Sequence, residues 1–238
     1  MRGFMKCSKG ALAVLCLTGA VTTTANAEEP SPLHYLNIQT IHPHARVAFL
    51  EAMRHNATQS RNEPANIVFD VADPGGDDPT VVLFESWRDR EGYLKHEASA
   101  HVAPVLALVP TSFAKPERKY LLENSPELPT PERKTIDHPT TSHNVLELIE
   151  LKPSAHDAFV KHARSEIVEA RQRPGNLVFN VYQEHDKPNT VVIYQRWTDA
   201  QAYEDFRARP GAASLDEVLN APGAEARETL ILRDRILE

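Results

Sequence analysis

Residues 64–71 read PANIVFDV, and the closely related PGNLVFNV stands at residues 174–181. A second pair keeps the same offset of 110 residues, because TVVLFESW at residues 80–87 returns as TVVIYQRW at residues 190–197. Self-similarity at one fixed offset is the signature of a duplicated structural unit. In the first copy a turn rich in Gly, Pro and Asp separates the two segments, which predicts a β-hairpin.

The offset aligns residues 33–122 with residues 143–232 without a gap, and 22 of these 90 positions are identical. We therefore predict two modules, at 33–123 and 143–238, joined by a proline-rich linker at 124–142. The duplication also supplies an internal control. A polar residue that is apolar in the other copy cannot be required by the shared fold.

The first 27 residues have the features of a secretory signal peptide. Three basic residues precede a short apolar run at residues 11–21, and Ala25–Ala27 offers a small-x-small cleavage site. We expect cleavage after Ala27 and a periplasmic or secreted mature protein. Both cysteines, Cys7 and Cys16, would leave with the signal, so the mature chain would have no disulfide.

The net charge of −7 argues against a polyanionic partner. Loss of three basic residues with the signal would make it −10, and the sequence shows no basic stripe. Nucleic acid and anionic membrane surfaces are therefore not expected as partners. Beyond the signal, no apolar stretch suggests a membrane span.

Local patterns predict the same elements in both copies. The expected strands cover residues 35–41, 66–71, 80–87 and 118–123, then 145–151, 176–182, 190–197 and 229–236. The expected helices begin near residues 43, 89 and 104, then near 154, 199 and 213. Asp89 is the expected N-cap of the second helix, and Ser154 with Asp157 forms a possible capping box at the fourth.

The order β-α-β-β-α-β is the ferredoxin-like α+β plan. Its antiparallel sheet has helices on one face only, so the other face needs a cover. We expect the two tandem modules to pack sheet to sheet as an intrachain pseudo-dimer. Pairing with a second chain as a homodimer is an alternative. Two independent modules would each expose an apolar sheet face.

The strand at residues 80–87 supplies the first candidate site residues. Leu83, Glu85 and Trp87 share one face of it by the two-residue period. Trp87 is also present in the second copy, as Trp197, so it could equally be a core anchor. Glu85 could be a half-exposed strand carboxylate.

The helix that follows supplies the remaining candidates. Tyr93 and His96 lie on one helical stripe, and the second copy has Phe206 at the position of His96. His96 should therefore point inward, where packing does not require an imidazole. Ser99 and His101 follow it. With the strand residues, they would line an apolar pocket with few polar groups, which is typical of a small-molecule site.

Other interpretations of these residues stay open. Tyr93 is conserved between the copies as Tyr203 and could be a core residue. His96 could be a hydrogen-bonded core histidine, and His101 could cap the helix C-terminus, where a cation is favoured. His96 and His101 are five residues apart, whereas the helical zinc motif needs four. A regular helix would turn them apart by about 140°, so we expect no metal site.

These motifs resemble the antibiotic biosynthesis monooxygenase family, including its quinol monooxygenase branch. The resemblance covers each module nearly end to end. Its motifs are the turn at Pro64–Asn66, the strand end Glu85–Trp87, and the helix end His96-x-x-Ser99-x-His101. The resemblance implies a dimeric α+β barrel, here formed within one chain.

The resemblance also implies a reaction. A quinol or a similar electron-rich aromatic would be oxygenated by O₂ without flavin, haem or metal, because the deprotonated phenol itself supplies electrons. His96 would be the base, and His101 or Tyr93 would donate to the developing oxyanion. The other predicted site residues would contact the substrate: Leu83, Glu85, Trp87 and Ser99.

The second copy departs from this pattern. It has Gln195, Phe206, Arg209 and Gly211 where the first has Glu85, His96, Ser99 and His101. We therefore expect one active pocket and one degenerate copy. Some oxygenases of this family use an Asn on the strand before the Trp, and Leu83 stands at that place here. A non-catalytic module that binds a small aromatic ligand, or a purely structural protein, would fit the same residues.

Overall fold

The computed structural model describes residues 31–135, 142–209 and 213–237. The predicted signal peptide, residues 1–27, lies outside them. Within these ranges no helix is long and apolar enough to cross a membrane.

The first module follows the predicted order of elements. Its strands are β1 (Leu33–Thr40), β2 (Asn66–Asp73), β3 (Thr80–Trp87) and β4 (Arg118–Asn124). Its helices are α1 (Arg46–Ser60), entered through a 3₁₀ turn at Pro43–Ala45, α2 (Arg90–Glu97) and α3 (Ala103–Ser112).

The second module repeats this order. Its strands are β5 (His143–Leu151), β6 (Asn176–Glu184), β7 (Lys187–Trp197) and β8 (Ala224–Ile236). Its helices are α4 (His156–Gln172), α5 (Ala200–Arg207) and α6 (Ala213–Val218), and α6 runs into a π-helical turn at Leu219–Gly223. The α+β plan of two tandem ferredoxin-like modules is confirmed.

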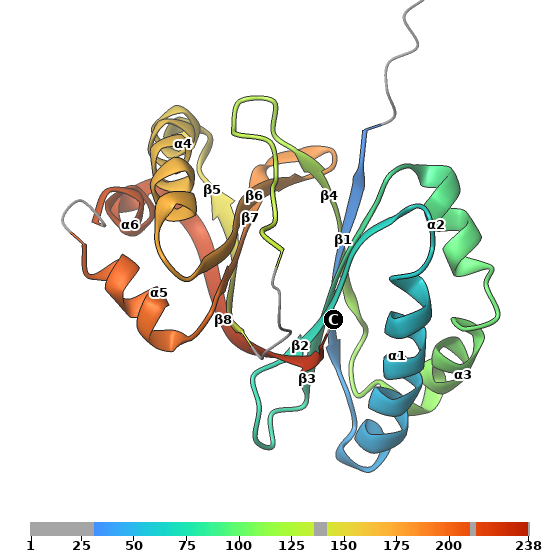
Figure 1. Ribbon diagram of the computed structural model, residues 1–238. Helices are drawn as coiled ribbons and strands as arrows, with labels where there is room; N and C mark the ends of the chain where they lie inside the picture. Colours follow the sequence, from blue (N-terminus) through green and yellow to red (C-terminus); the bar gives the residue numbers. More distant parts are fainter. Residues whose placement is uncertain (1–30, 136–141, 210–212, 238) are drawn as a thin grey trace, which may run out of the picture.

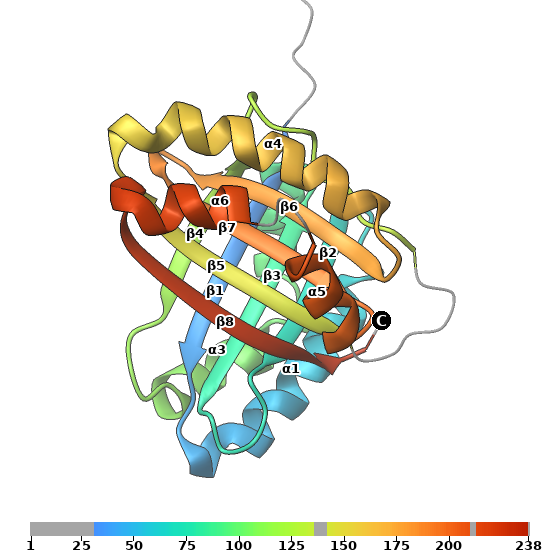
Figure 2. The ribbon, with the colours of Figure 1, turned by 90° about the vertical axis from the view of Figure 1, so that its left-hand side faces the viewer.

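All eight strands form one closed barrel in the order β1-β3-β2-β8-β5-β7-β6-β4. Each module contributes four adjacent strands, and the pairs β2–β8 and β4–β6 join the two modules. Both joints are antiparallel, so closure leaves no open sheet edge in the barrel. The expected intrachain pseudo-dimer is therefore confirmed. The barrel closes without a second chain, with the helices of each module on its outer faces (Figures 1 and 2).

Alternation along each strand divides the apolar side chains between two environments. On β3, Val81 and Leu83 pack toward the helices, whereas Val82 and Phe84 belong to a cluster inside the barrel. Two helix-side clusters, one for each module, flank this shared interior cluster. The second face of each sheet is thus covered by the other module, which removes the apolar surface that independent modules would expose.

The turn into α2 fixes the position of the candidate site. As predicted, Asp89 is the N-cap, and its carboxylate accepts a hydrogen bond from the Gly92 backbone nitrogen at 2.7 Å. Gly92 packs on the turn at Pro64–Asn66, since a Cβ there would lie 2.2 Å from the Cβ of Ala65. The predicted capping box at Ser154 is wrong. A 3₁₀ turn leads into α4, whose N-cap, Ala155, makes no side-chain cap bond.

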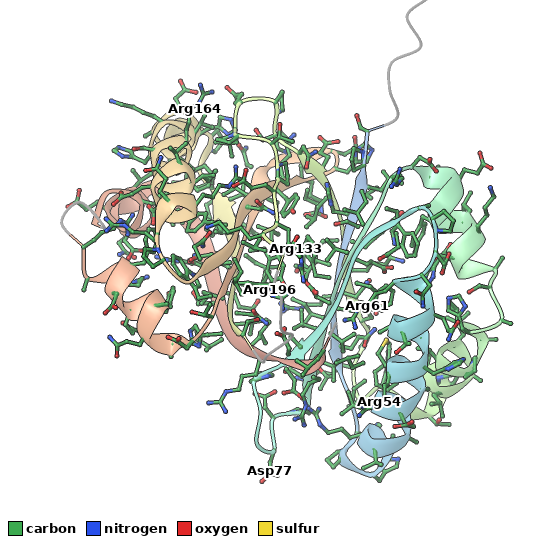
Figure 3. The ribbon with its side chains drawn as sticks, in the orientation of Figure 1. Arg54, Arg61, Asp77, Arg133, Arg164 and Arg196 are labelled. Carbon is green, nitrogen blue, oxygen red and sulfur yellow. The ribbon has the colours of Figure 1, made fainter. Side chains whose placement is uncertain are left out.

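A buried charged cluster, which we call the Asp70 cluster, lies where β2 meets the second module. The Asp70 carboxylate accepts hydrogen bonds from Arg133 (2.7 and 2.9 Å), Arg196 (3.1 Å) and the Tyr194 hydroxyl (2.9 Å). Arg196 also donates to Asp234 at 2.9 Å. Since Arg133 belongs to the linker and Arg196 to β7, the cluster ties three parts of the chain together. Figure 3 shows both arginines between the two modules.

His34 occupies a related polar cluster of the first module. Its Nδ1 accepts from the Ser86 hydroxyl at 2.7 Å, and its Nε2 donates to the Asn124 side chain at 3.0 Å. This arrangement suits the neutral imidazole. Burial lowers the pKa of His34 to about 4, although the hydrogen bond to Asn124 opposes the shift.

Stability is therefore expected to fall as the pH drops from about 6.5 toward 4. In this window His34 is protonated in the unfolded chain but stays neutral in the folded protein. The free energy of unfolding therefore falls by up to about 3 kcal/mol. His34→Asn introduces the residue that the second module uses at this position, Asn144. Urea unfolding of both proteins at several pH values tests this. The stability of the variant should depend less on pH in this window than that of the wild type, and equal slopes for both proteins would contradict the assignment.

Candidate functional site

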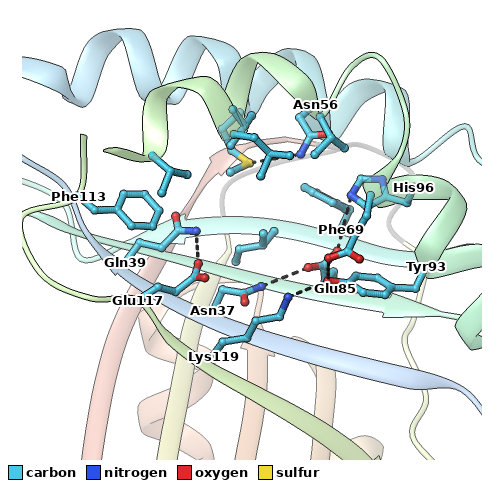
Figure 4. Close-up of a pocket in the computed structure, with 17 residues that line it drawn as sticks. Asn37, Gln39, Asn56, Phe69, Glu85, Tyr93, His96, Phe113, Glu117 and Lys119 are labelled. Atoms are coloured by element: carbon cyan, nitrogen blue, oxygen red, sulfur yellow. Dashed lines mark hydrogen bonds and ion pairs between the residues drawn. The ribbon is translucent and has the colours of Figure 1, made fainter. Parts of the chain in front are cut away.

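A cavity of about 350 Å³ lies between the sheet and the helices of the first module (Figure 4). Its apolar wall comes mainly from α3 and the residues beside it, and includes Met53, Leu83, Val105, Val109 and Phe113. Its polar side chains come largely from the strand side, and include Asn37, Gln39, Glu85, Glu117 and Lys119. The cavity has more polar groups than the predicted pocket, and its binding of a small aromatic molecule stays a prediction.

Glu85 is the buried acid of this cavity, with 4% of its surface exposed. The Trp87 indole N–H donates to its Oε2 at 2.9 Å, and the Asn37 amide donates to its Oε1 at 3.2 Å. Burial raises the pKa of Glu85 to about 7, against the hydrogen bond from Trp87 and the charge of Lys119. Two side chains therefore orient a carboxylate that exchanges protons readily near neutral pH.

His96 points inward, as predicted, and is 4% exposed. Its ring packs 4.4 Å from the Trp87 ring and edge-on to Phe69 at 5.7 Å. Nδ1 lies 2.8 Å from Glu63 Oε1, and Nε2 lies 4.0 Å from Glu85 Oε2. Burial lowers the pKa of His96 more strongly than Glu63 raises it. With Glu63 as the hydrogen-bond acceptor, a neutral His96 ring would carry its proton on Nδ1 and turn a lone pair toward Glu85.

Ser99 and His101 lie behind His96 and do not line the cavity. His101 Nε2 is 2.9 Å from Glu63 Oε1 and 3.1 Å from the Ser99 hydroxyl. The two imidazole rings are 5.6 Å apart, so the expectation that they point apart is wrong. The reason is that α2 ends at Glu97, and the chain turns before His101 instead of continuing a regular helix.

Tyr93 lines the cavity, but its hydroxyl is already engaged. It donates to Glu97 Oε1 at 2.6 Å and accepts from Lys119 Nζ at 2.7 Å. Burial raises the pKa of Tyr93, and the hydrogen bond to Glu97 raises it further. The phenol therefore stays protonated. It could donate to a developing oxyanion only by giving up Glu97, so this predicted role stays a prediction.

Trp87 lies beneath the cavity rather than on its surface. It is fully buried and does not line the cavity. The second module repeats the arrangement, because Trp197 donates to Gln195 at 3.1 Å and packs 4.8 Å from Phe206. This repetition favours the interpretation of Trp87 as a core anchor. Its indole N–H also orients Glu85. Direct stacking of Trp87 on a substrate stays a prediction.

The corresponding region of the second module is occupied by charged pairs. The Arg209 guanidinium lies 3.5 Å from the Phe206 ring and pairs with Glu166 at 3.4 Å. Arg227 bridges Glu147 and Asp216 at 2.6 and 2.8 Å. These charged side chains pair with one another in the region that corresponds to the cavity of the first module.

Sequence reasoning missed three residues of the site: Asn37, Glu63 and Lys119. The comparison of the copies contained a signal for each, since the second module has Glu147, Arg173 and Thr229 at these positions. Such differences identify residues that the shared fold does not require. They do not show that Asn37 meets Glu85 or that Glu63 meets two histidines, because those contacts join distant parts of the chain.

Comparison with known proteins agrees with this architecture. A family model described as antibiotic biosynthesis monooxygenase matches residues 35–105 and 143–215. A comparison with curated proteins finds no match.

Three solved structures share the tandem fold across most of the chain. A Fusobacterium nucleatum protein described as a candidate monooxygenase has 13% identity, a TM-score of 0.78, and coverage of 89% of this chain and 95% of its own. A Lactobacillus acidophilus protein with the same description has 17% identity, a TM-score of 0.73, and coverage of 87% and 95%. An anthrone oxidase-like protein has 16% identity, a TM-score of 0.61, and coverage of 88% and 94%. At these identities the similarity shows the fold alone.

Proposed function

The chain belongs to the antibiotic biosynthesis monooxygenase family, and on that basis we propose that its first module oxygenates a quinol or a similar electron-rich aromatic with O₂, without a bound cofactor. The observation that carries the proposal is the oriented carboxylate of Glu85 in a largely apolar cavity. The predicted signal peptide supports export of the enzyme to the periplasm or beyond.

Glu85 is the group we assign as the general base. Its two oxygens are held by Trp87 and Asn37, and each retains a lone pair for a substrate hydroxyl. His96 Nε2 lies 4.0 Å from the same carboxylate, beyond hydrogen-bond distance, and its lone pair can receive the proton that Glu85 has taken from the substrate. This assignment differs from the prediction that His96 alone is the base, and it makes His96 chiefly a positioning residue.

The substrate itself supplies the electrons in this proposal. Transfer of a phenolic proton to Glu85 leaves an electron-rich phenolate that reduces O₂. For a quinol, one oxygen atom enters the ring to give a hydroxyquinone, and the other leaves as water, so no external reductant is needed. The apolar wall excludes bulk water from the reactive intermediates.

Oxygen uptake with a panel of hydroquinones tests the proposal, with wild type compared to His96→Phe. The variant introduces the residue that already packs against Trp197 in the second module, so the fold should be retained. We expect uptake to fall by roughly 10²-fold because Glu85 loses its imidazole neighbour.

Three outcomes separate the alternatives. If the wild type takes up oxygen and His96→Phe does so at the same rate, the proposed role of His96 is overturned. Aromatic ligands that raise the melting temperature without any uptake would favour a binding module instead. If the wild type takes up no oxygen and no aromatic ligand raises its melting temperature, both functions are overturned.

A further inference from the structure

We infer that Glu63, His96 and His101 form a binding site for a divalent transition-metal ion of the zinc type, on the side of His96 away from the cavity. One carboxylate oxygen and two imidazole nitrogens lie within 4.8 Å of one another. In the part of the chain that the structure describes, no other set of three such residues converges in this way. Glu63 and His101 do not line the cavity, whereas His96 does, so the metal site adjoins the proposed catalytic one and shares His96 with it.

The donor atoms of the three side chains are already close together. Glu63 Oε1 lies 2.8 Å from His96 Nδ1 and 2.9 Å from His101 Nε2. Ligands of a tetrahedral zinc ion lie about 3.3 Å apart, given metal–ligand distances near 2.0 Å. To admit the ion, each of these two distances would lengthen by about half an ångström, and the two imidazole nitrogens, which lie within 4.8 Å of each other, would move to a similar spacing. Two imidazoles and one carboxylate form a donor set typical of zinc and ferrous sites.

The groups around the three ligands support this assignment. His96 is held between the Trp87 and Phe69 rings, so its orientation is fixed before an ion arrives. An ion on Nδ1 would leave the proton of the ring on Nε2, which faces Glu85 Oε2 at 4.0 Å, and metal-bound imidazoles commonly donate to a carboxylate in this manner. This tautomer is the opposite of the metal-free one, in which Nδ1 carries the proton. The Ser99 hydroxyl lies 3.1 Å from His101 Nε2 and would have to release that hydrogen bond when the nitrogen binds an ion.

The second module provides independent support. At the positions of Glu63, His96 and His101 it has Arg173, Phe206 and Gly211, none of which can bind a metal ion. It nevertheless forms the same fold, so packing does not require the three residues. Their joint replacement is the pattern expected for residues that act as one functional unit.

The competing interpretation is a hydrogen-bonded triad in which Glu63 accepts one proton from each imidazole. A titration with Co²⁺ distinguishes the metal site from the hydrogen-bonded triad. Binding is monitored by the visible absorption of the ion and by calorimetry. Untagged, chelator-stripped protein with Cys7→Ser and Cys16→Ser should bind one Co²⁺ with a tetrahedral spectrum that Zn²⁺ abolishes. No substrate is involved, so the result is independent of the proposed oxygenation.

Matched variants locate the ion. Glu63→Gln and His101→Ala should each weaken binding at least about tenfold. His44→Ala should not, although the His42 and His44 rings stack at 5.2 Å on another surface. Circular dichroism in chelator verifies that each variant is folded. Absence of one-to-one binding, binding that both ligand variants retain, or loss of binding in His44→Ala would overturn the proposal.

Discussion

Replacing Glu85 with glutamine is expected to lower kcat for quinol oxygenation by about 10³-fold while the protein stays folded. Glutamine keeps the shape of the side chain and can still accept the hydrogen bond from Trp87. It cannot take the substrate proton. The second module already contains this arrangement, because Gln195 accepts from Trp197 at 3.1 Å.

Oxygen uptake and the thermal midpoint should be measured on the same preparations. The midpoint is expected to be unchanged or higher, because a neutral amide avoids the cost of burying a carboxylate. Glu85→Asp gives a useful comparison, since it keeps the charge but withdraws it from Trp87 and Asn37. A Glu85→Gln enzyme that retains wild-type kcat would show that another group accepts the proton.

Replacing Asp70 with asparagine is expected to lower the free energy of unfolding by about 3–5 kcal/mol. The variant keeps the volume of the side chain, but Arg133 and Arg196 lose the carboxylate that they share. The buried Arg196 guanidinium and the part-buried Arg133 guanidinium then lie close together with less compensation of their charge. For a chain of this size the melting temperature should fall by roughly 10 °C.

An exposed ion pair supplies the control for Asp70→Asn. Arg118 donates to both oxygens of Glu228 at 2.7 and 3.0 Å, but both side chains are more than 40% exposed. Glu228→Gln should therefore cost no more than about 1 kcal/mol, because water already solvates both partners. If Asp70→Asn and Glu228→Gln lower the free energy of unfolding equally, burial does not determine how much the Asp70 cluster stabilises the fold.

The sequence determined the architecture because the fold depends on patterns that can be counted along the chain. The offset of 110 residues reveals the duplication. The alternation in residues 80–87 and the turn residues are local signals that specify a strand and its ends. Strands β2 and β3 start at the residues predicted for them, and β3 also ends as predicted. The prediction of sheet-to-sheet packing followed from the need to cover an apolar face.

Part of the site also followed from the sequence. The inward position of His96 could be predicted because Phe206 replaces it in the other module. Leu83, Glu85 and Tyr93 do line the cavity, in agreement with the stripe on which the prediction was based. The separation of His96 from His101 was predicted incorrectly, because the argument assumed a regular helix where α2 in fact ends.

Only the tertiary structure decided how these side chains meet. Asn37 and Glu85 are 48 residues apart, and Glu63 and His96 are 33 residues apart. No period in the sequence connects such positions, because strand register and the path of the chain between elements set their distance. The same holds for closure of the barrel through β2–β8 and β4–β6, which a linear pattern leaves undetermined. The duplicated pattern specified what each module would be, and long-range packing specified which groups share a site.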